Sequence, residues 1–265
     1  MKSILLLANE DKGFEPRLAA ALALARAGGG HVTCLQARPF NSFVVADPFG
    51  GVYAPATLLA RLEEVDAAHE ARIEDRLRGE NVPWEWVRQD GETGHALVAR
   101  ASLADVIVVS LPGDDDAALA VAGDVALHAR AAILAIPSGG GFDPGGRAMI
   151  AWNGSPESAH ALRLAMPLLA LASGVAVVTV GEDGGRFAAL DASRYLARHG
   201  IAAELVERPA AARRAAEALV DAATAVGAGT IVMGAYGHTR LREAVLGGVT
   251  RDMLRHSPLP LLLAH

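Results

Sequence analysis

Residues 231–250 read IVMGAYGHTRLREAVLGGVT, an apolar strand-like run that leads into glycines at positions 234, 237 and 247. Glycine lets backbone N–H groups approach an anion closely and adopts a positive φ without strain. The last four residues, Gly247-Gly248-Val249-Thr250, add a second backbone turn and a hydroxyl group. A helix beginning there would favour an anion at its N-terminus. A tight turn or close helix packing explains any single glycine, but the whole spaced set indicates a phosphate-binding loop after a strand.

The same spacing occurs 124 residues earlier, after another apolar run, at Ser110, Gly113 and Gly123. We interpret this agreement as a duplication. The clearest break between the copies is a glycine-rich stretch, so the predicted domains are residues 1–138 and 147–265, with 139–146 as the linker. A length of 265 residues suits two domains of ordinary small size.

Strand-like and helix-like segments alternate along both halves. In the second half the expected strands are near residues 148–152, 176–180, 203–207, 230–233 and 260–264. Alternation of this kind, with continuously apolar strands, favours parallel sheets covered on both faces. The predicted fold is α/β, with two tandem doubly wound domains, each a five-stranded parallel sheet flanked by about four helices.

The composition excludes several classes of protein. With 52% hydrophobic and 20% charged residues the chain is not disordered. A single cysteine, Cys34, excludes a disulfide framework and a thiolate metal cluster, and we expect it in a buried strand. A net charge of −6 gives no reason to expect nucleic acid or an anionic membrane as a partner.

An uncharged run at residues 164–181 is long enough to suggest a membrane span. Pro167 and the Ser173-Gly174 pair interrupt it, and a β-branched segment follows, so a helix end and a buried strand fit better. The apolar run at the start of the sequence meets Glu10 and Asp11 too early for a signal peptide. We therefore expect a cytoplasmic protein.

The spacing Gly-x2-Gly-x9-Gly, the Val249-Thr250 pair and the tail Ser257-Pro-Leu-Pro260 resemble the nucleotide-binding signature of the universal stress protein family. The resemblance covers the chain as a tandem of two such domains and is stronger in the second half. It implies a Rossmann-like stress-response protein of the UspA type. It also implies that ATP, or a related adenine nucleotide, lies between the glycine loop and the end of the first strand.

The resemblance implies which residues of this sequence would contact each part of the nucleotide. The adenine would meet the backbone of Val180, with Asn153 near the nucleoside, and the sugar would lie near Met233 and Gly234. The phosphates would face Gly237, Gly247, Gly248, Val249 and Thr250. Two residues depart from the family pattern. Asn153 replaces an aspartate, which keeps hydrogen bonding but loses the charge. Gly248 replaces a serine or threonine, which removes one hydroxyl. A plain core valine remains the alternative for Val180.

The first half lacks the residues of this nucleotide-binding signature. Asp114-Asp115-Asp116 follows Gly113 directly, and Asp124 stands in the place of Gly248. Carboxylates there would repel a triphosphate, so we expect no ATP in the first domain. We interpret the aspartate run as a solvated helix N-terminus rather than a metal site. Residues 1–138 accordingly hold 19 acidic and 12 basic residues, against 11 and 12 in the remainder.

Three functions are compatible with these features. The first is a regulatory protein whose second domain binds ATP or another adenine nucleotide, with or without Mg²⁺. The second is a slow ATPase or adenylyl-transfer enzyme at the same loop, although no catalytic or metal-binding residue is assigned. The third is an interaction module for an unidentified protein partner that has lost nucleotide binding. The resemblance also implies that the final strands, near residues 133–136 and 259–263 and both apolar, pair within one chain as a pseudo-dimer, while further homodimerisation stays open.

Overall fold

The computed structural model describes residues 1–38, 45–46, 52–53, 56–181, 186–209, 214–235 and 248–265. The strands are β1 (Ser3–Leu7), β2 (His31–Arg38), β3 (Val45–Ala46), β4 (Val52–Tyr53), β5 (Trp84–Asp90), β6 (Val106–Ser110), β7 (Ala132–Ile136), β8 (Ala148–Trp152), β9 (Val175–Val180), β10 (Ala203–Arg208), β11 (Thr230–Gly234) and β12 (Leu261–Ala264). The helices are α1 (Phe14–Gly28), α2 (Ala56–Arg78), α3 (Thr93–Arg100), the short 3₁₀ helix η2 (Ala101–Leu103), α4 (Asp116–His128), α5 (Pro156–Leu169), α6 (Ala189–Arg198), α7 (Ala215–Ala225) and α8 (Gly248–His256).

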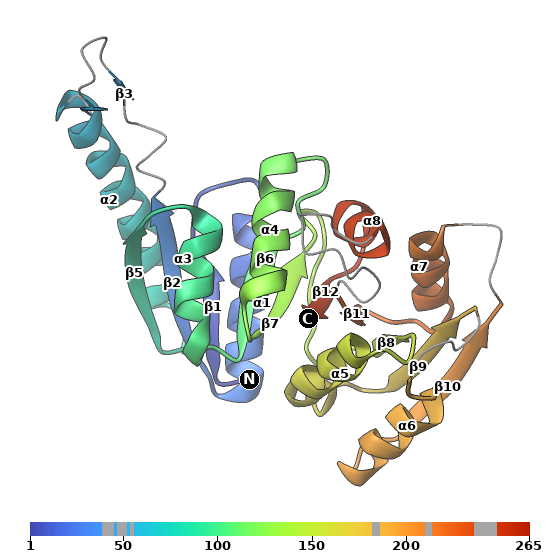
Figure 1. Cartoon of the computed structure of the whole chain (residues 1–265). Helices are drawn as coiled ribbons and strands as arrows, with labels where there is room; N and C mark the ends of the chain where they lie inside the picture. Colours follow the sequence, from blue (N-terminus) through green and yellow to red (C-terminus); the bar gives the residue numbers. More distant parts are fainter. Residues whose placement is uncertain (39–44, 47–51, 54–55, 182–185, 210–213, 236–247) are drawn as a thin grey trace.

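Ten strands form one continuous sheet in the order β10-β9-β8-β11-β12-β7-β6-β1-β2-β5 (Figure 1). Five strands of the second half stand on one side of it, and five strands of the first half on the other. Within this sheet all pairs inside each half are parallel, whereas β7 and β12 pair antiparallel where the halves meet, and β3 and β4 form a separate antiparallel pair. The predicted α/β class and the two tandem five-stranded parallel sheets are confirmed.

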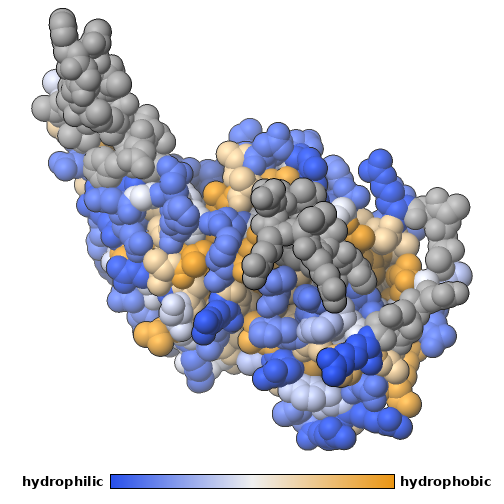
Figure 2. Space-filling model, in the orientation of Figure 1, coloured by the Kyte–Doolittle hydropathy of each residue, from blue (hydrophilic) through white to orange (hydrophobic). Residues whose placement is uncertain are grey.

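Both faces of the sheet are covered by helices, as continuously apolar strands require. Alternate side chains of a strand point to opposite faces, so Ile4 and Leu6 of β1 join one buried cluster and Leu5 joins the other. The first cluster includes residues of α1, α2, α5 and α6, and the second includes residues of α3, α4, α7 and α8. On the face seen in Figure 2, hydrophilic residues predominate around smaller apolar patches.

The pairing of the two final strands produces the pseudo-dimer expected within one chain. Leu262 stands opposite Leu134 at the centre of the junction, and both are fully buried. An ion pair crosses the same junction from α8 to the start of α4, between Arg255 and Asp116. The two halves therefore share apolar strand surface in addition to this polar contact.

Some elements differ from their predicted bounds. The sequence pattern of the second half predicts a last helix near residues 241–256, and the structure describes it from Gly248 onward, because residues 241–247 lie outside the described part of the chain. The uncharged run at 164–181 divides into the end of α5 and strand β9, as expected. None of the helices in the described residues combines the length and apolar character needed to cross a membrane. Helix α2 extends past the sheet toward β3 (Figure 1).

Candidate functional site

Strands β8 and β11 form a topological switch point. They are neighbours, yet the chain leaves β8 for α5 on one face and, beyond β11, continues to α8 on the other. Ligands of open α/β sheets bind at the carboxyl ends of such strands. We call the ends of β8, β9 and β11 with the first turn of α5 the second-half site. The first-half site is the corresponding set, namely the ends of β1, β2 and β6 with the first turn of α1.

The strand pairings define which residues of the two sites are equivalent. Ile4 pairs with Val106 and Val32 in the first half, and Ala148 pairs with Thr230 and Val175 in the second. Asn9 and Asn153 are therefore equivalent, because each follows its β1 or β8 position by five residues. Ala37 and Val180 are equivalent in the same way on β2 and β9. Glu15 and Glu157 are each the second residue of their helix, and Arg17 and Ala159 are each the fourth.

The backbone of Val180 faces the second-half site. Successive residues of a parallel strand direct their N–H and C=O groups to opposite neighbours. The N–H of Gly181 donates to the Arg208 carbonyl on β10 over 2.8 Å, so the polar groups of Val180 point toward the end of β8 instead. Trp152, the last residue of β8, pairs with Thr179, a register that engages the Val180 N–H with the Trp152 carbonyl, so Val180 presents its carbonyl beyond the end of β8.

Asn153 lies in the tight connection from β8 to α5. Its Oδ1 accepts from the N–H of Ser155 at 3.2 Å, and Gly154 between them has φ +70, which favours glycine. Ser155 caps α5 by accepting from the Ser158 N–H at 3.1 Å. Among the described residues, no hydrogen bond links the exposed Asn153 side chain to Val180. This connection holds Asn153 at the strand end without filling the space near Val180.

Gly234 permits α5 to begin directly against the end of β11. A Cβ atom at this position would lie 2.6 Å from the carbonyl carbon of Glu157 and 2.6 Å from the Ser158 nitrogen. Glycine is therefore required here by packing, whatever its place in ligand binding. Met233, one residue earlier, is 5% exposed and belongs to the buried cluster, so its side chain contributes to the core.

Helix α8 begins with the last residues of the predicted phosphate loop. Gly248 is exposed, and a Cβ atom added there would meet nothing within 4 Å. Val249 is partly exposed, and Thr250 is buried at 4% exposure. Gly237 and Gly247 lie outside the described residues, as do His238 and Arg240. The structure thus places Gly248, Val249 and Thr250 in the first described turn of α8.

In the first-half site, the Asn9 side chain is bonded to the backbone of Ala37. Its Oδ1 accepts from the Ala37 N–H at 2.9 Å, and its Nδ2 donates to the Ala37 carbonyl at 2.8 Å. The amide thus satisfies both polar groups of the residue that corresponds to Val180. A ligand that binds the Ala37 N–H and carbonyl in the first half would have to displace the Asn9 side chain.

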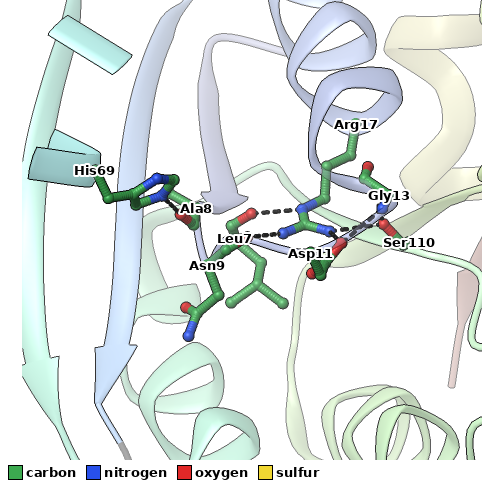
Figure 3. A network of polar contacts seen from close by, with 8 residues as sticks. All are labelled: Leu7, Ala8, Asn9, Asp11, Gly13, Arg17, His69 and Ser110. Carbon is green, nitrogen blue, oxygen red and sulfur yellow. Dashed lines mark hydrogen bonds and ion pairs between the residues drawn. The ribbon is translucent and has the colours of Figure 1, made fainter. Parts of the chain in front are cut away.

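Arg17 fills the rest of the first-half site (Figure 3). Its side chain is fully buried, and its guanidinium donates to the Leu7 and Asn9 carbonyls. It also donates to Asp11 Oδ1 at 2.6 Å and to Ser110 Oγ at 2.8 Å. A buried guanidinium is tolerated only when it is paired and hydrogen-bonded. The ends of β1 and β6 are consequently tied together by a side chain of α1, where the second half has Ala159.

The aspartate run forms the predicted helix N-terminus. Oδ1 of Asp115 caps α4 by accepting from the N–H groups of Ala117 and Ala118. The Asp114 and Asp116 side chains are 96% and 86% exposed, and Arg255 of α8 contacts both carboxylates. The contact with Arg255 was not predicted, because α4 and α8 are distant in sequence and come together where β7 pairs with β12.

Other potentially reactive groups have structural explanations. Burial raises the pKa of the Cys34 thiol to about 12, with a smaller contribution from the Glu85 carboxylate, so it is a poor nucleophile. Within the described parts of the chain, no group of three or more His, Cys, Asp and Glu side chains is arranged to hold a metal ion.

Comparison with known proteins agrees with this architecture. Residues 146–265 match the model of the universal stress protein family. A universal stress protein from Archaeoglobus fulgidus DSM 4304 has a TM-score of 0.75 at 15% identity, covering 98% of this chain and 97% of that one. A putative universal stress protein from Pseudomonas aeruginosa UCBPP-PA14 has a TM-score of 0.61 at 17% identity, covering 100% and 93%. A functionally unknown protein from Pseudomonas aeruginosa PAO1 has a TM-score of 0.58 at 16% identity, covering 100% and 92%. No curated protein matches the sequence.

The chain is thus a tandem doubly wound α/β protein with a switch-point site in each half. Its second half matches the model of the universal stress protein family, and the whole chain shares the fold of the full-length structures above. Sequence reasoning assigned the second-half residues but missed Arg17 and the pairing of Asn9 with Ala37. The one available signal for Arg17 was a cation inside an alanine-rich helix, at the position where the second half has Ala159.

Proposed function

We propose that the chain is a cytoplasmic, stress-response regulatory protein whose second half binds ATP or a related adenine nucleotide. The observation that carries this proposal is the Val180 carbonyl, an acceptor that faces the switch point beyond the end of β8. The amino group of adenine offers the complementary donor. The equivalent residue of the first half, Ala37, is bonded to the Asn9 amide, which supports a planar hydrogen-bonding group at this position.

The start of α8 is suited to the other end of such a ligand. Gly248 has open space at its Cα, and the helix N-terminus favours negative charge. Base and phosphates would then occupy two separate places, one beside β9 and one at α8, with the strand ends of β8 and β11 between them. This separation supports a nucleotide over a small inorganic anion. Mg²⁺ would accompany the phosphates as their counter-ion.

The most direct experiment is native mass spectrometry of the freshly purified chain, followed by calorimetric titration with ATP, ADP and AMP. One adenine nucleotide per chain is the expected result. Two per chain would contradict the assignment of a single binding half, and complete absence of adenine nucleotide affinity would favour the interaction module. Turnover of labelled ATP that is abolished by Gly237→Asp would change the assignment to an enzyme.

A further inference from the structure

One carboxylate in the second-half site has no hydrogen-bond partner. Oε2 of Glu157 is buried, and among the described residues nothing donates a hydrogen bond to it. Glu157 belongs to the first turn of α5, and its Cβ lies against Gly234 at the end of β11. Leaving a buried charged acceptor unsatisfied costs more than leaving a neutral one. A donor for this carboxylate would therefore have to come from beyond the described residues.

The position of Glu157 decides which part of a nucleotide could supply that donor. Val180 is on β9, on one side of β8, and Gly248 begins α8, which follows β11 on the other side. Any nucleotide that contacts both must carry its ribose across the ends of β8 and β11. Glu157 stands at that point, because Gly234 is the last residue of β11.

The chemistry of a carboxylate agrees with this placement. It accepts hydrogen bonds and donates none, so hydroxyl groups satisfy it, whereas phosphate oxygens repel it. Acidic residues accept hydrogen bonds from ribose hydroxyls in other doubly wound nucleotide sites. We propose that Glu157 binds the ribose 2′- or 3′-hydroxyl and makes the second half selective for ribonucleotides. This inference rests on the proposed adenine nucleotide binding, which it deepens.

The assignment also accounts for the neutral residue at the end of β8. The exposed Asn153 offers no charge, and its Oδ1 is engaged by the N–H of Ser155. Glu157 is four residues later and provides the only carboxylate within the connection from β8 through the first turn of α5. Its counterpart Glu15 in the first half is exposed, so the two glutamates form a matched pair for experiments.

The test is calorimetric titration of the full chain with ATP, 2′-deoxy-ATP and 3′-deoxy-ATP, each with and without Mg²⁺. The wild type should bind at least one deoxy analogue about tenfold more weakly than ATP. Glu157→Ala should lose this discrimination, and Glu157→Gln, which keeps one acceptor oxygen, should retain part of it. Glu15→Ala should behave like the wild type. Circular dichroism and thermal melting confirm that each variant is folded.

The outcomes separate the two proposals. If the wild type binds no adenine nucleotide, the proposed function is wrong, and the ribose assignment falls with it. If it binds ATP and both deoxy analogues equally, only the ribose assignment is wrong. The same conclusion follows if Glu157→Ala weakens all three nucleotides equally and only in the presence of Mg²⁺, because Glu157 would then act through the metal ion.

Discussion

In the first-half site, the Asn9 amide and the Arg17 guanidinium bond the strand ends, whereas the equivalent residues of the second half are Asn153, which accepts from the Ser155 N–H, and Ala159. The strands pair in the same register in both halves, although β8 and β9 stay paired one residue further, at Trp152 and Thr179, so most of the backbone framework is shared. The difference therefore lies in side chains. It teaches that a duplicated switch point can be used either for internal hydrogen bonds or for a ligand.

The charges of the two halves follow the same division. The acidic run at residues 114–116 caps and solvates α4 in the first half, and Asp124 has taken the place of Gly248. In the second half, α8 begins with uncharged residues. The first half thus satisfies its strand ends internally and opposes phosphate with negative charge.

The largest expected effect is on the stability of the first half. Arg17→Met removes every guanidinium hydrogen bond and leaves the Leu7 and Asn9 carbonyls without their donor. We expect a loss of about 3 kcal/mol in the free energy of unfolding, measured by urea denaturation. The control is Arg194→Met, which removes an exposed ion pair to Asp191 and should cost below about 1 kcal/mol. Equal losses of unfolding free energy in the two variants would show that the buried Arg17 network contributes no more stability than an exposed ion pair.

The next effect concerns nucleotide affinity. Gly248→Asp gives the second half the residue that the first half has at Asp124, and the open space at Gly248 lets the side chain enter without a clash. One carboxylate near the phosphates should weaken ATP binding about 10- to 100-fold by charge repulsion. Gly79→Asp, at another open and exposed glycine, adds the same charge far along the chain from α8 and should leave the affinity unchanged. Calorimetry that shows the same affinity for both variants would argue against phosphates at α8.

A smaller effect should distinguish the two asparagines. Asn9→Ala removes both hydrogen bonds to Ala37 and should cost about 1–2 kcal/mol of unfolding free energy. Asn153→Ala removes a single exposed contact to Ser155 and should cost less than about 1 kcal/mol. Urea denaturation of the two variants side by side measures the difference. A larger loss for Asn153→Ala would reverse the comparison between the sites.

The smallest effect is a pH dependence at the start of β1. Burial tends to raise the pKa of Asp105, but hydrogen bonds from the Lys2 and Ser3 N–H groups, together with the N-terminal ammonium, lower it overall. A lowered pKa in the folded state stabilises the protein above the unfolded-state pKa, and this stabilisation is lost as the pH falls through the folded value. Asp105→Asn should therefore be less stable than the wild type at pH 7, and the difference should shrink below about pH 4. The second half has Gly229 at this position and should show no counterpart.

Much of the fold could be predicted from local sequence. Apolar strands, alanine-rich helices and glycine punctuation are properties of short segments, and they gave the alternating elements and the duplicated spacing. The pairing of β7 with β12 was also anticipated, from the family resemblance together with the apolar sequences of both final strands. The candidate residues of the second half came from the glycine pattern together with a family resemblance, and their binding of a nucleotide stays a prediction.

The contents of the two sites could not be predicted in this way. Arg17 meets Ser110 only because β1 and β6 are neighbours in the sheet, although the residues are 93 positions apart. The pairing of Asn9 with Ala37 likewise depends on the register between β1 and β2. Periodicity and composition determine which segments become strands and helices, since those preferences act over a few residues. Only the tertiary structure decides which side chain satisfies which strand end, because those hydrogen bonds join residues that the sequence keeps far apart.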